Sequence, residues 1–426
     1  MTAAFVLAWR GLWRGKTLWL LLAAVVAAHV VLPDLARSDG SPAGMLEMRI
    51  RVVCGAIAAL VYVASLALAC GSFARDREDD LLPLSLVRPV SAFSVAAGRW
   101  LALLLLMACV LAANALCLNI ALGAADSAPG DCRLHREPTL PPVEVTAAAA
   151  MEAFLKSDKT PEAVKKSPRA AILSLLAAKE MERYEVIRPG RSASWPFDAP
   201  RGEALSVRAR FSTMYNMKEP LSGVFRYRGR EGAVSNSTQA ILEVPLRFAP
   251  GDVLRPFAAG GDVSRDLELT FTNTGATDVM LRPRRDVELL SPGDSFLANS
   301  LRASVEMLAL AGLLAAFGLF LSAGLSRPVA LFTAAVLLAS ALMAPDAVSQ
   351  FPDEFNATFG ERAGLAISRA VTRFTAALSE ISPVSDMASG RAIPLWHMLR
   401  VVVADLVAWP LLFFALSAFV IRRKVK

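Results

Sequence analysis

Six long apolar runs constrain the fold of this 426-residue chain more than any other feature. The runs occupy residues 17–32, 52–73, 100–125, 303–325, 329–344 and 399–421. A helix that crosses a bilayer needs about 20 apolar residues, within a range of about 17–25. Four runs reach this length, whereas the first and the fifth, with 16 residues each, need flanking residues to do so. For these two runs, a buried core helix is the alternative interpretation.

The composition also indicates a membrane protein. Hydrophobic residues make up 55% of the chain and charged residues 19%, whereas soluble domains have roughly 25% charged residues. In a soluble chain the net charge of +7 would suggest nucleic acid as a partner. In a membrane chain the positions of Lys and Arg instead report topology. No nucleic-acid partner is therefore expected.

The positions of Lys and Arg predict six spans with both termini in the cytoplasm. In this orientation the inner segments are 1–16, 74–99, 326–328 and 422–426, and they hold 12 basic and 4 acidic residues. The rest of the chain holds 33 basic and 34 acidic residues. Arg37, Arg49 and Arg51 depart from the rule because they lie in or beside the first outer loop. The expected location is the inner membrane of a bacterium.

The first run also follows a basic segment, as the apolar region of a signal peptide does. No small-x-small cleavage site comes after it, because the sequence continues His-Val-Val-Leu-Pro-Asp. We therefore expect a retained helix in the N-terminal membrane half, residues 1–125. Residues 303–426 form the C-terminal membrane half.

Residues 126–302, between the third and fourth runs, are numerous enough for a separate domain. The part 140–185 is helical in pattern, with Pro168 expected to break its second helix. The part 186–295 alternates apolar and polar residues in short stretches separated by turn residues. These stretches are 205–211, 223–228, 241–248 and 267–271. The pattern predicts an extracytoplasmic α+β domain that ends in an antiparallel β-sandwich, with Pro245 on an edge strand.

Signatures of catalysis are weak. The stretch Arg10–Thr17 resembles a phosphate-binding loop, but Arg10 replaces the first glycine and no strand precedes it. A basic flank of the first span, with Trp9, Trp13 and Trp19 as interfacial anchors, explains it better. The three histidines, His29, His135 and His397, are dispersed, and only Cys132 lies outside an apolar run. We therefore expect no catalytic residues, no metal site, no cofactor and no disulfide framework.

Ionisable and amide side chains inside the spans are candidates for function. Asp405 and Glu306 could line a polar path or relay protons, or each could pair structurally with a neighbouring arginine such as Arg302 or Arg400. Asn114 and Asn119 are expected to hydrogen-bond to other helices. The outer segment 361–381 carries a helical apolar stripe, so it should form an amphipathic helix at the outer face or against the outer domain.

The inner segment 74–99 is the most informative part of the sequence. A charge cluster at 75–80 is followed by leucines and by Arg88-Pro-Val-Ser91, and Ser91 is a candidate N-cap of the helix that enters the third span. A charged and apolar segment between two spans suits docking to a cytoplasmic partner. An ordinary solvated loop is the alternative.

Here the chain resembles the ABC-2-type transporter permeases, the membrane subunits of one class of ATP-driven exporters. Arg88-Pro-Val-Ser91 and Gly98-Arg99 match the pattern that follows the second span in that family. The C-terminal stretches 382–386, 390–391 and 422–424 are similar to its closing pattern. Three positions depart from it: Asp80-Leu81 replaces Gly-Thr, Pro83 interrupts the leucines, and Ala92 stands where a basic residue is frequent. The resemblance covers 1–125 and 303–426.

The resemblance implies a non-catalytic permease that works with a cytoplasmic ATP-binding subunit and a second permease copy or a homologous permease, among membrane lipids. It also implies that a coupling segment docks on the ATPase. The residues implied are Arg75, Asp76, Arg77, Glu78, Asp79, Asp80, Leu82, Leu84, Leu86, Arg88, Pro89, Val90 and Ser91.

Two other functions are possible from the sequence. One is a membrane-anchored scaffold or sensor whose outer domain binds a cell-envelope partner, or a permease that does work on such a partner. The other is a membrane enzyme acting on lipid-linked substrates, for which only Asp405, Glu306 and His397 supply candidate groups.

Overall fold

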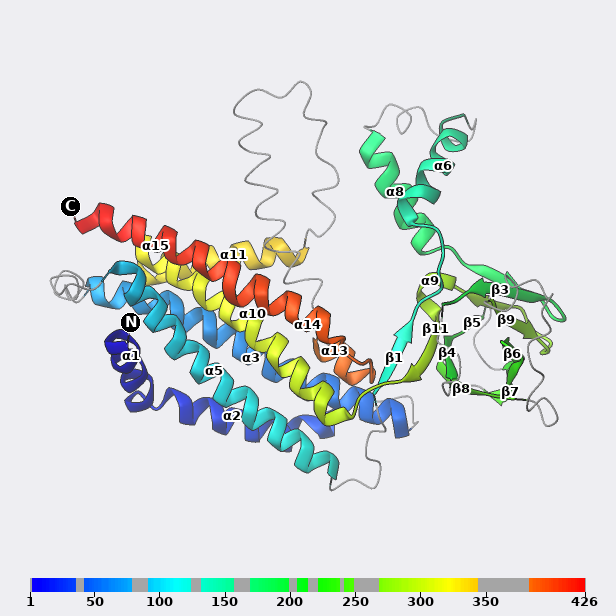
Figure 1. Cartoon of the computed structure of the whole chain (residues 1–426), viewed down its shortest axis with the longest axis horizontal. Coiled ribbons are helices and arrows are strands. Elements are labelled where there is room, and N and C mark those ends of the chain that lie inside the picture. Colours follow the sequence, from blue (N-terminus) through cyan, green and yellow to red (C-terminus); the bar gives the residue numbers. More distant parts are fainter. Residues whose placement is uncertain are drawn as a thin grey trace. The chain divides into compact units, whose positions relative to one another are not determined.

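The computed structural model describes ten segments of the chain. They are residues 2–35, 42–78, 91–123, 132–156, 169–198, 205–213, 221–237, 241–248, 268–343 and 383–425. These residues form two compact units (Figure 1). The helical unit contains the described residues up to Cys132 and from Asp294 onward, and the second unit contains those from Arg133 to Gly293.

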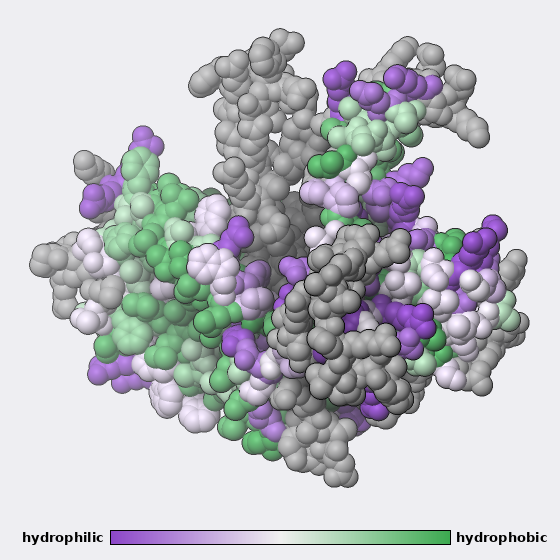
Figure 2. All heavy atoms as spheres, turned by 45° about the vertical axis from the view of Figure 1, so that its right-hand side comes forward, coloured by the Kyte–Doolittle hydropathy of each residue, from purple (hydrophilic) through white to green (hydrophobic). Residues whose placement is uncertain are grey.

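Five helices of the helical unit are long and apolar enough to cross a membrane. They cover Thr17–Asp34, Met45–Ala74, Ala92–Ala121, Phe296–Gly324 and Leu395–Arg423. The chain is thus a multi-pass membrane protein with a helical membrane unit. The run at 329–344 corresponds to a shorter helix, α11 (Arg327–Met343). Figure 2 shows a largely apolar surface over the helices and a more polar one over the second unit.

The five long helices coincide with five of the apolar runs, and α3, α5 and α10 begin seven to ten residues before theirs. They are α2 (Thr17–Val31), α3 (Pro42–Glu78), α5 (Ala92–Gly123), α10 (Phe296–Gly324) and α15 (Trp409–Val425). Helix α15 continues α14 (Leu395–Val401) through a π-helical segment, η5 (Val402–Ala408). The remaining short elements are α1 (Thr2–Arg14), the 3-10 helix η1 (Leu32–Leu35) and α13 (Pro383–Ala388).

Helix α10 is the central helix of the bundle, because 83% of its span is buried. It packs against α3, α5 and α15 (Figure 1). Glycines permit this packing: a Cβ at Gly318 would come within 2.8 Å of the Ala69 Cβ on α3. In a membrane the hydrophobic effect does not drive helices together. Helix association depends instead on close packing, and small residues allow the helix backbones to approach closely.

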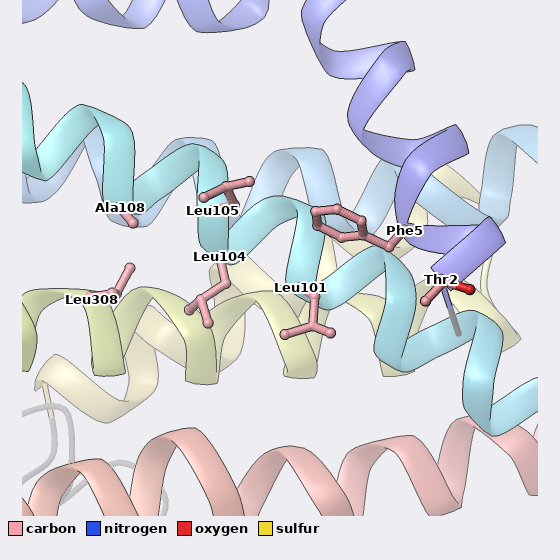
Figure 3. A pocket seen from close by; sticks show the side chains of 7 residues that line it. All are labelled: Thr2, Phe5, Leu101, Leu104, Leu105, Ala108 and Leu308. Atoms are coloured by element: carbon pink, nitrogen blue, oxygen red, sulfur yellow. The ribbon is translucent and has the colours of Figure 1, made fainter.

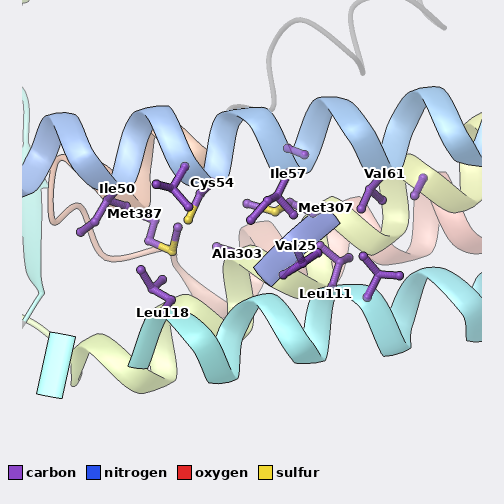
Figure 4. Close-up of a cluster of buried hydrophobic side chains, with 14 of the residues drawn as sticks. Val25, Ile50, Cys54, Ile57, Val61, Leu111, Leu118, Ala303, Met307 and Met387 are labelled. Carbon is purple, nitrogen blue, oxygen red and sulfur yellow. The ribbon is translucent and has the colours of Figure 1, made fainter. Parts of the chain in front are cut away.

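The core of the bundle combines side chains from helices far apart in the sequence. Figure 4 shows one cluster, in which Val25 of α2, Ile57 of α3, Leu111 of α5 and Met307 of α10 meet. Cys132 belongs to this cluster and is 1% exposed. Cys132, the one cysteine outside the apolar runs of the sequence, is thus buried among the helices. The chain enters and leaves the second unit here, and the Cys132 N–H donates to the Asp294 carbonyl at 2.9 Å.

The second unit is an antiparallel β domain with a small helical part. Its main sheet has eight strands in the order β1-β11-β4-β8-β7-β6-β9-β3, and curves into a half-barrel, while β2, β10 and β5 form a three-stranded sheet. The strands of the main sheet are β1 (Arg133–Arg136), β3 (Ser192–Pro196), β4 (Leu205–Arg210), β6 (Leu221–Tyr227), β7 (Arg230–Ser237), β8 (Ile241–Phe248), β9 (Glu268–Asn273) and β11 (Val287–Pro292). Those of the small sheet are β2 (Glu185–Ile187), β5 (Ser212–Thr213) and β10 (Val279–Leu281).

Alternation in the sequence correctly predicted β4, β6, β8 and β9. Their inward residues share one core with the small sheet, built around Phe211, Phe225 and Phe271. A two-residue turn joins β6 to β7, with Arg228 at φ 50° and Gly229 at φ 72°, as tight hairpins require.

The expectation of an edge position for Pro245 was wrong, because β8 lies between β4 and β7. The β7–β8 ladder joins only Arg230 to Phe248 and Glu231 to Arg247. Pro245 lies outside that ladder and is paired only on the β4 side, with Ser206. Proline has no N–H to donate, but no ladder hydrogen bond to β7 is needed at this position.

Two helices, α6 (Val143–Lys156) and α8 (Arg169–Met181), pack together through Ala147, Ile172 and Leu176. Helix α8 begins directly after Pro168, where the sequence predicted a break. A one-turn helix, α9 (Pro283–Asp286), precedes β11. The predicted amphipathic helix at 361–381 lies outside the described residues.

Candidate functional site

The C-terminal end of α3 and the N-terminal end of α5 flank the predicted coupling segment, and one arginine ties them together. Arg99 of α5 donates to the carboxylate of Asp76 on α3. It also donates to the Ser72 carbonyl at 2.8 Å, and its guanidinium lies 4.4 Å from the centre of the Phe73 ring. Charged hydrogen bonds and a cation–π contact therefore fix the spacing of the two helices.

The N-cap prediction for Ser91 is confirmed. Ser91 precedes the first residue of α5, and its Oγ accepts a hydrogen bond from the Ser94 N–H at 3.2 Å. Of the other predicted coupling residues, Arg75, Asp76, Arg77 and Glu78 end α3. The remaining ones, Asp79, Asp80, Leu82, Leu84, Leu86, Arg88, Pro89 and Val90, lie outside the described residues.

Glu306 lies on α10 and is 1% exposed. The imidazole of His397 on α14 lies close to it, with 3.9 Å between His397 Nε2 and Glu306 Oε1, which is too long for a hydrogen bond. Oε1 has no hydrogen-bond partner among the described residues. Tyr62 and Asp386 lie within electrostatic range of this carboxyl.

The proposed pairing of Glu306 with Arg302 was wrong. Arg302 instead donates to Asp294 Oδ2 at 2.5 Å and to the Ile393 carbonyl at 3.0 Å. These partners draw the guanidinium to the end of α10, a full turn away from Glu306.

Asp405 is the most isolated polar side chain of the bundle. It is 1% exposed, and neither carboxyl oxygen has a hydrogen-bond partner in the described part of the chain. It lies inside η5, where the Trp409 N–H bonds to the Ala404 carbonyl, five residues back. Pro410 explains this local geometry: proline has no N–H for the carbonyl four residues earlier and clashes with it. Such π-helical segments occur often at functional sites.

Asn114 joins three helices. Its Oδ1 lies 3.1 Å from Nε2 of His29 on α2, and its side chain also bonds to the Cys54 thiol on α3. The prediction of an interhelical bond is thus confirmed for Asn114. For Asn119 it was wrong, because Asn119 Nδ2 donates to the Ala115 carbonyl of its own helix at 2.7 Å.

Asn299 was not among the candidate residues predicted from the sequence. Its side chain accepts from the Ile393 N–H at 2.7 Å and donates to the Arg391 carbonyl at 2.8 Å, so it clamps the segment before α14 to α10. The only sign of it in the sequence was an amide side chain just before the apolar run at 303–325. No local pattern marked His29 either, because its partner Asn114 lies 85 positions away in the sequence.

The stretch that resembles a phosphate-binding loop forms a helical corner. Helix α1 ends at Arg14, and Lys16 adopts a left-handed φ of 58° before α2 starts at Thr17. Trp13 lies between Trp9 and Trp19 in tilted and edge-to-face contacts, with ring centroids 6.2 and 5.6 Å apart. A phosphate-binding loop must follow a strand, so this geometry is not that of a nucleotide site.

The second unit contains a charged network where its helices meet its strands. Arg282 makes a bidentate pair with the buried Asp286, at 3.0 and 3.1 Å, and reaches Glu182 Oε2 at 2.6 Å. The hydrogen bond from Arg282 lowers the pKa of Glu182, and the bonds to Asp286 raise the pKa of Arg282. Beside this network lies a pocket of about 490 Å³, lined by residues that include Tyr184, Trp195 and Arg284.

Comparison of the chain with models of known protein families finds no match, and comparison with curated proteins finds none either. The site must therefore be interpreted from its own chemistry.

Proposed function

We propose that this chain is the non-catalytic membrane subunit of an ATP-driven transport complex of the ABC-2 type. In this proposal a separate cytoplasmic subunit hydrolyses ATP, and segment 75–91 carries its motion to α3 and α5. The observation that carries the proposal is the Arg99–Asp76 tie. It joins the two helix ends that flank the segment, so a force on the segment would move both spans as one body.

The proposal includes a topology. Helix α11, although short, would be the sixth span, and both termini and segment 75–91 would face the cytoplasm of a bacterial cell. The β domain would lie outside and would be a sandwich of two sheets around one core. A second copy, or a homologous permease, would complete the membrane part.

The proposal also assigns roles inside the bundle. Asp405 and Glu306 are buried carboxyls, and both oxygens of Asp405 and Oε1 of Glu306 have no hydrogen-bond partner among the described residues. Such groups are expensive in a membrane and are retained for function. They would line the path of a polar or cationic part of the substrate.

The test is co-purification with an ATPase. The tagged chain is expressed in its native host and tested for co-purification with an ABC-type ATPase, and replacement of Arg88-Pro-Val-Ser91 by four alanines should abolish co-purification or stimulated hydrolysis. A matched control replaces Arg226 and Glu231, an exposed pair of the β6–β7 hairpin, by alanine. Unchanged ATPase binding and hydrolysis in the first variant would refute the coupling role.

A second function is favoured by the pocket beside Tyr184 and Trp195. Tyr, Trp and Arg are the residues enriched at protein-binding hot spots. The chain would then be a scaffold or sensor whose β domain binds an envelope protein. Capture of an envelope protein by the isolated chain, with no ATPase in the complex, would favour this function over transport.

A further inference from the structure

An apolar groove of about 460 Å³ lies on the membrane unit between α1, α5 and α10. Its lining residues are Thr2, Phe5, Leu101, Leu104, Leu105, Ala108 and Leu308. Figure 3 shows the side chains along α5, with Leu308 of α10 opposite Ala108 at one end and Phe5 of α1 at the other. We propose that this groove binds one acyl chain of an anionic phospholipid whose phosphate contacts the basic side chains of α1.

The depth of the groove matches one leaflet. Arg99 donates hydrogen bonds to Asp76 and to the Ser72 carbonyl. We take its position on α5 as the boundary between the polar region and the hydrocarbon core. The groove begins two residues later, at Leu101, and ends at Ala108. Nine residues of helix from Arg99 to Ala108 span about 14 Å. Half of a hydrocarbon core of about 30 Å is nearly the same length, so an acyl chain would fill the groove from the boundary to the bilayer centre.

The lining favours lipid over a second copy of the chain. Helices that associate in membranes do so through small residues, which allow close backbone approach. This chain uses such residues inside the bundle, at Gly312 and Gly318 of α10. The groove is instead lined mainly by leucines and a phenylalanine, and the Leu105 side chain is 40% exposed. Bulky, flexible and exposed side chains suit contact with acyl chains.

The charge of α1 favours an anionic headgroup. Phe5 reaches into the groove, whereas Arg10, Arg14 and Lys16 are exposed. Arg10 lies about 8 Å further along the helix axis than Phe5, within reach of a headgroup whose chain occupies the groove. Basic residues at a membrane surface attract anionic lipids. The contacting rings of Trp9, Trp13 and Trp19 at this end of α1 suit the same interfacial level.

The experiment uses the full chain in nanodiscs that contain phosphatidylglycerol with a photoreactive acyl chain. Labelled peptides are identified by mass spectrometry. The proposal expects labelling of α5 at 101–108 that saturates and is competed by unlabelled phosphatidylglycerol more effectively than by phosphatidylcholine. Labelling that rises linearly with probe, and equally at Leu116 on the exposed side of α5, would mean bulk lipid and would overturn it.

Two variants sharpen the test. Ala108→Trp fills the groove and should reduce labelling at 101–105 at least five-fold, whereas the control Leu116→Trp on the same helix should not. Arg10→Gln with Arg14→Gln should remove the preference for phosphatidylglycerol and leave chain labelling in place. Labelling at the groove that falls when the chains are crowded in the nanodisc would identify a second copy as the occupant. If Ala108→Trp does not fold, saturable or linear labelling of the wild-type chain still distinguishes a bound lipid from bulk lipid.

Discussion

Arg99 of α5 donates a hydrogen bond to the Asp76 carboxylate of α3, and the pair is largely removed from solvent, with 15% and 24% of the side chains exposed. The two residues lie 23 positions apart at either end of the segment that we propose to dock on an ATPase. The pair therefore determines how that segment is held at the base of the bundle.

Replacement of Arg99 by glutamine should destabilise the bundle by roughly 1–3 kcal/mol, because the charged hydrogen bond to the Asp76 carboxylate is lost. Thermal unfolding in detergent micelles measures this. The control Arg51→Gln removes an exposed pair with Glu47 on α3, which should change stability by less than about 0.5 kcal/mol. Equal effects of the two substitutions would contradict the role of Arg99 as a tie.

The Asn114–His29 contact should show coupling in a double-mutant cycle. Interhelical polar contacts in membranes contribute about 0.6–2 kcal/mol, so Asn114→Ala and His29→Ala should be less than additive by about that amount. Asn119→Ala paired with His29→Ala is the matched control, since Asn119 bonds only within α5. Strict additivity of Asn114→Ala and His29→Ala would show that α2 is not held by this contact.

Replacement of Asp405 by leucine should raise the thermal stability of the bundle, because a buried carboxyl without a hydrogen-bond partner among the described residues is costly. The gain should be about 1–3 kcal/mol on the scale for polar groups in protein interiors. Under the proposed function, the same variant should lose transport while still assembling. A loss of stability would instead mean that Asp405 has a structural partner.

Gly318→Ala should destabilise the α3–α10 contact by roughly 1–3 kcal/mol, because the new methyl group would overlap Ala69. Gly324→Ala on the same helix is the control, since its nearest side-chain atom lies 3.7 Å from the ideal Cβ. That control should be neutral or slightly stabilising through helix propensity. Unfolding midpoints of the two variants in the same detergent decide between these outcomes.

The Glu182–Arg282 contact should make the β domain sensitive to acid. Because the pKa of Glu182 is lowered in the folded state, its contribution is present above the unfolded pKa of about 4.3 and is lost as the pH falls through the folded pKa. Between pH 5 and pH 3, the unfolding temperature of the wild-type domain should therefore fall more than that of Glu182→Gln. Parallel pH profiles would contradict this.

The sequence by itself determined the elements that depend on local periodicity and length. Runs of about 20 apolar residues gave four spans of the bundle, and alternation gave β4, β6, β8 and β9, because both patterns follow from the pitch of one helix or strand. Ser91 was predictable as an N-cap for the same reason: the cap and the N–H that it satisfies are only three residues apart.

Tertiary structure alone decided which residues meet. The Asn114–His29 contact, the hydrogen bond from Arg302 to the Ile393 carbonyl, and the place of Pro245 inside the sheet depend on packing between distant segments. Two asparagines on one helix, Asn114 and Asn119, had the same predicted role, yet Asn114 bonds to His29 of another helix, whereas Asn119 donates to a carbonyl of its own helix. A side chain's type fixes which bonds it can make, but the packed neighbours fix which of them it makes.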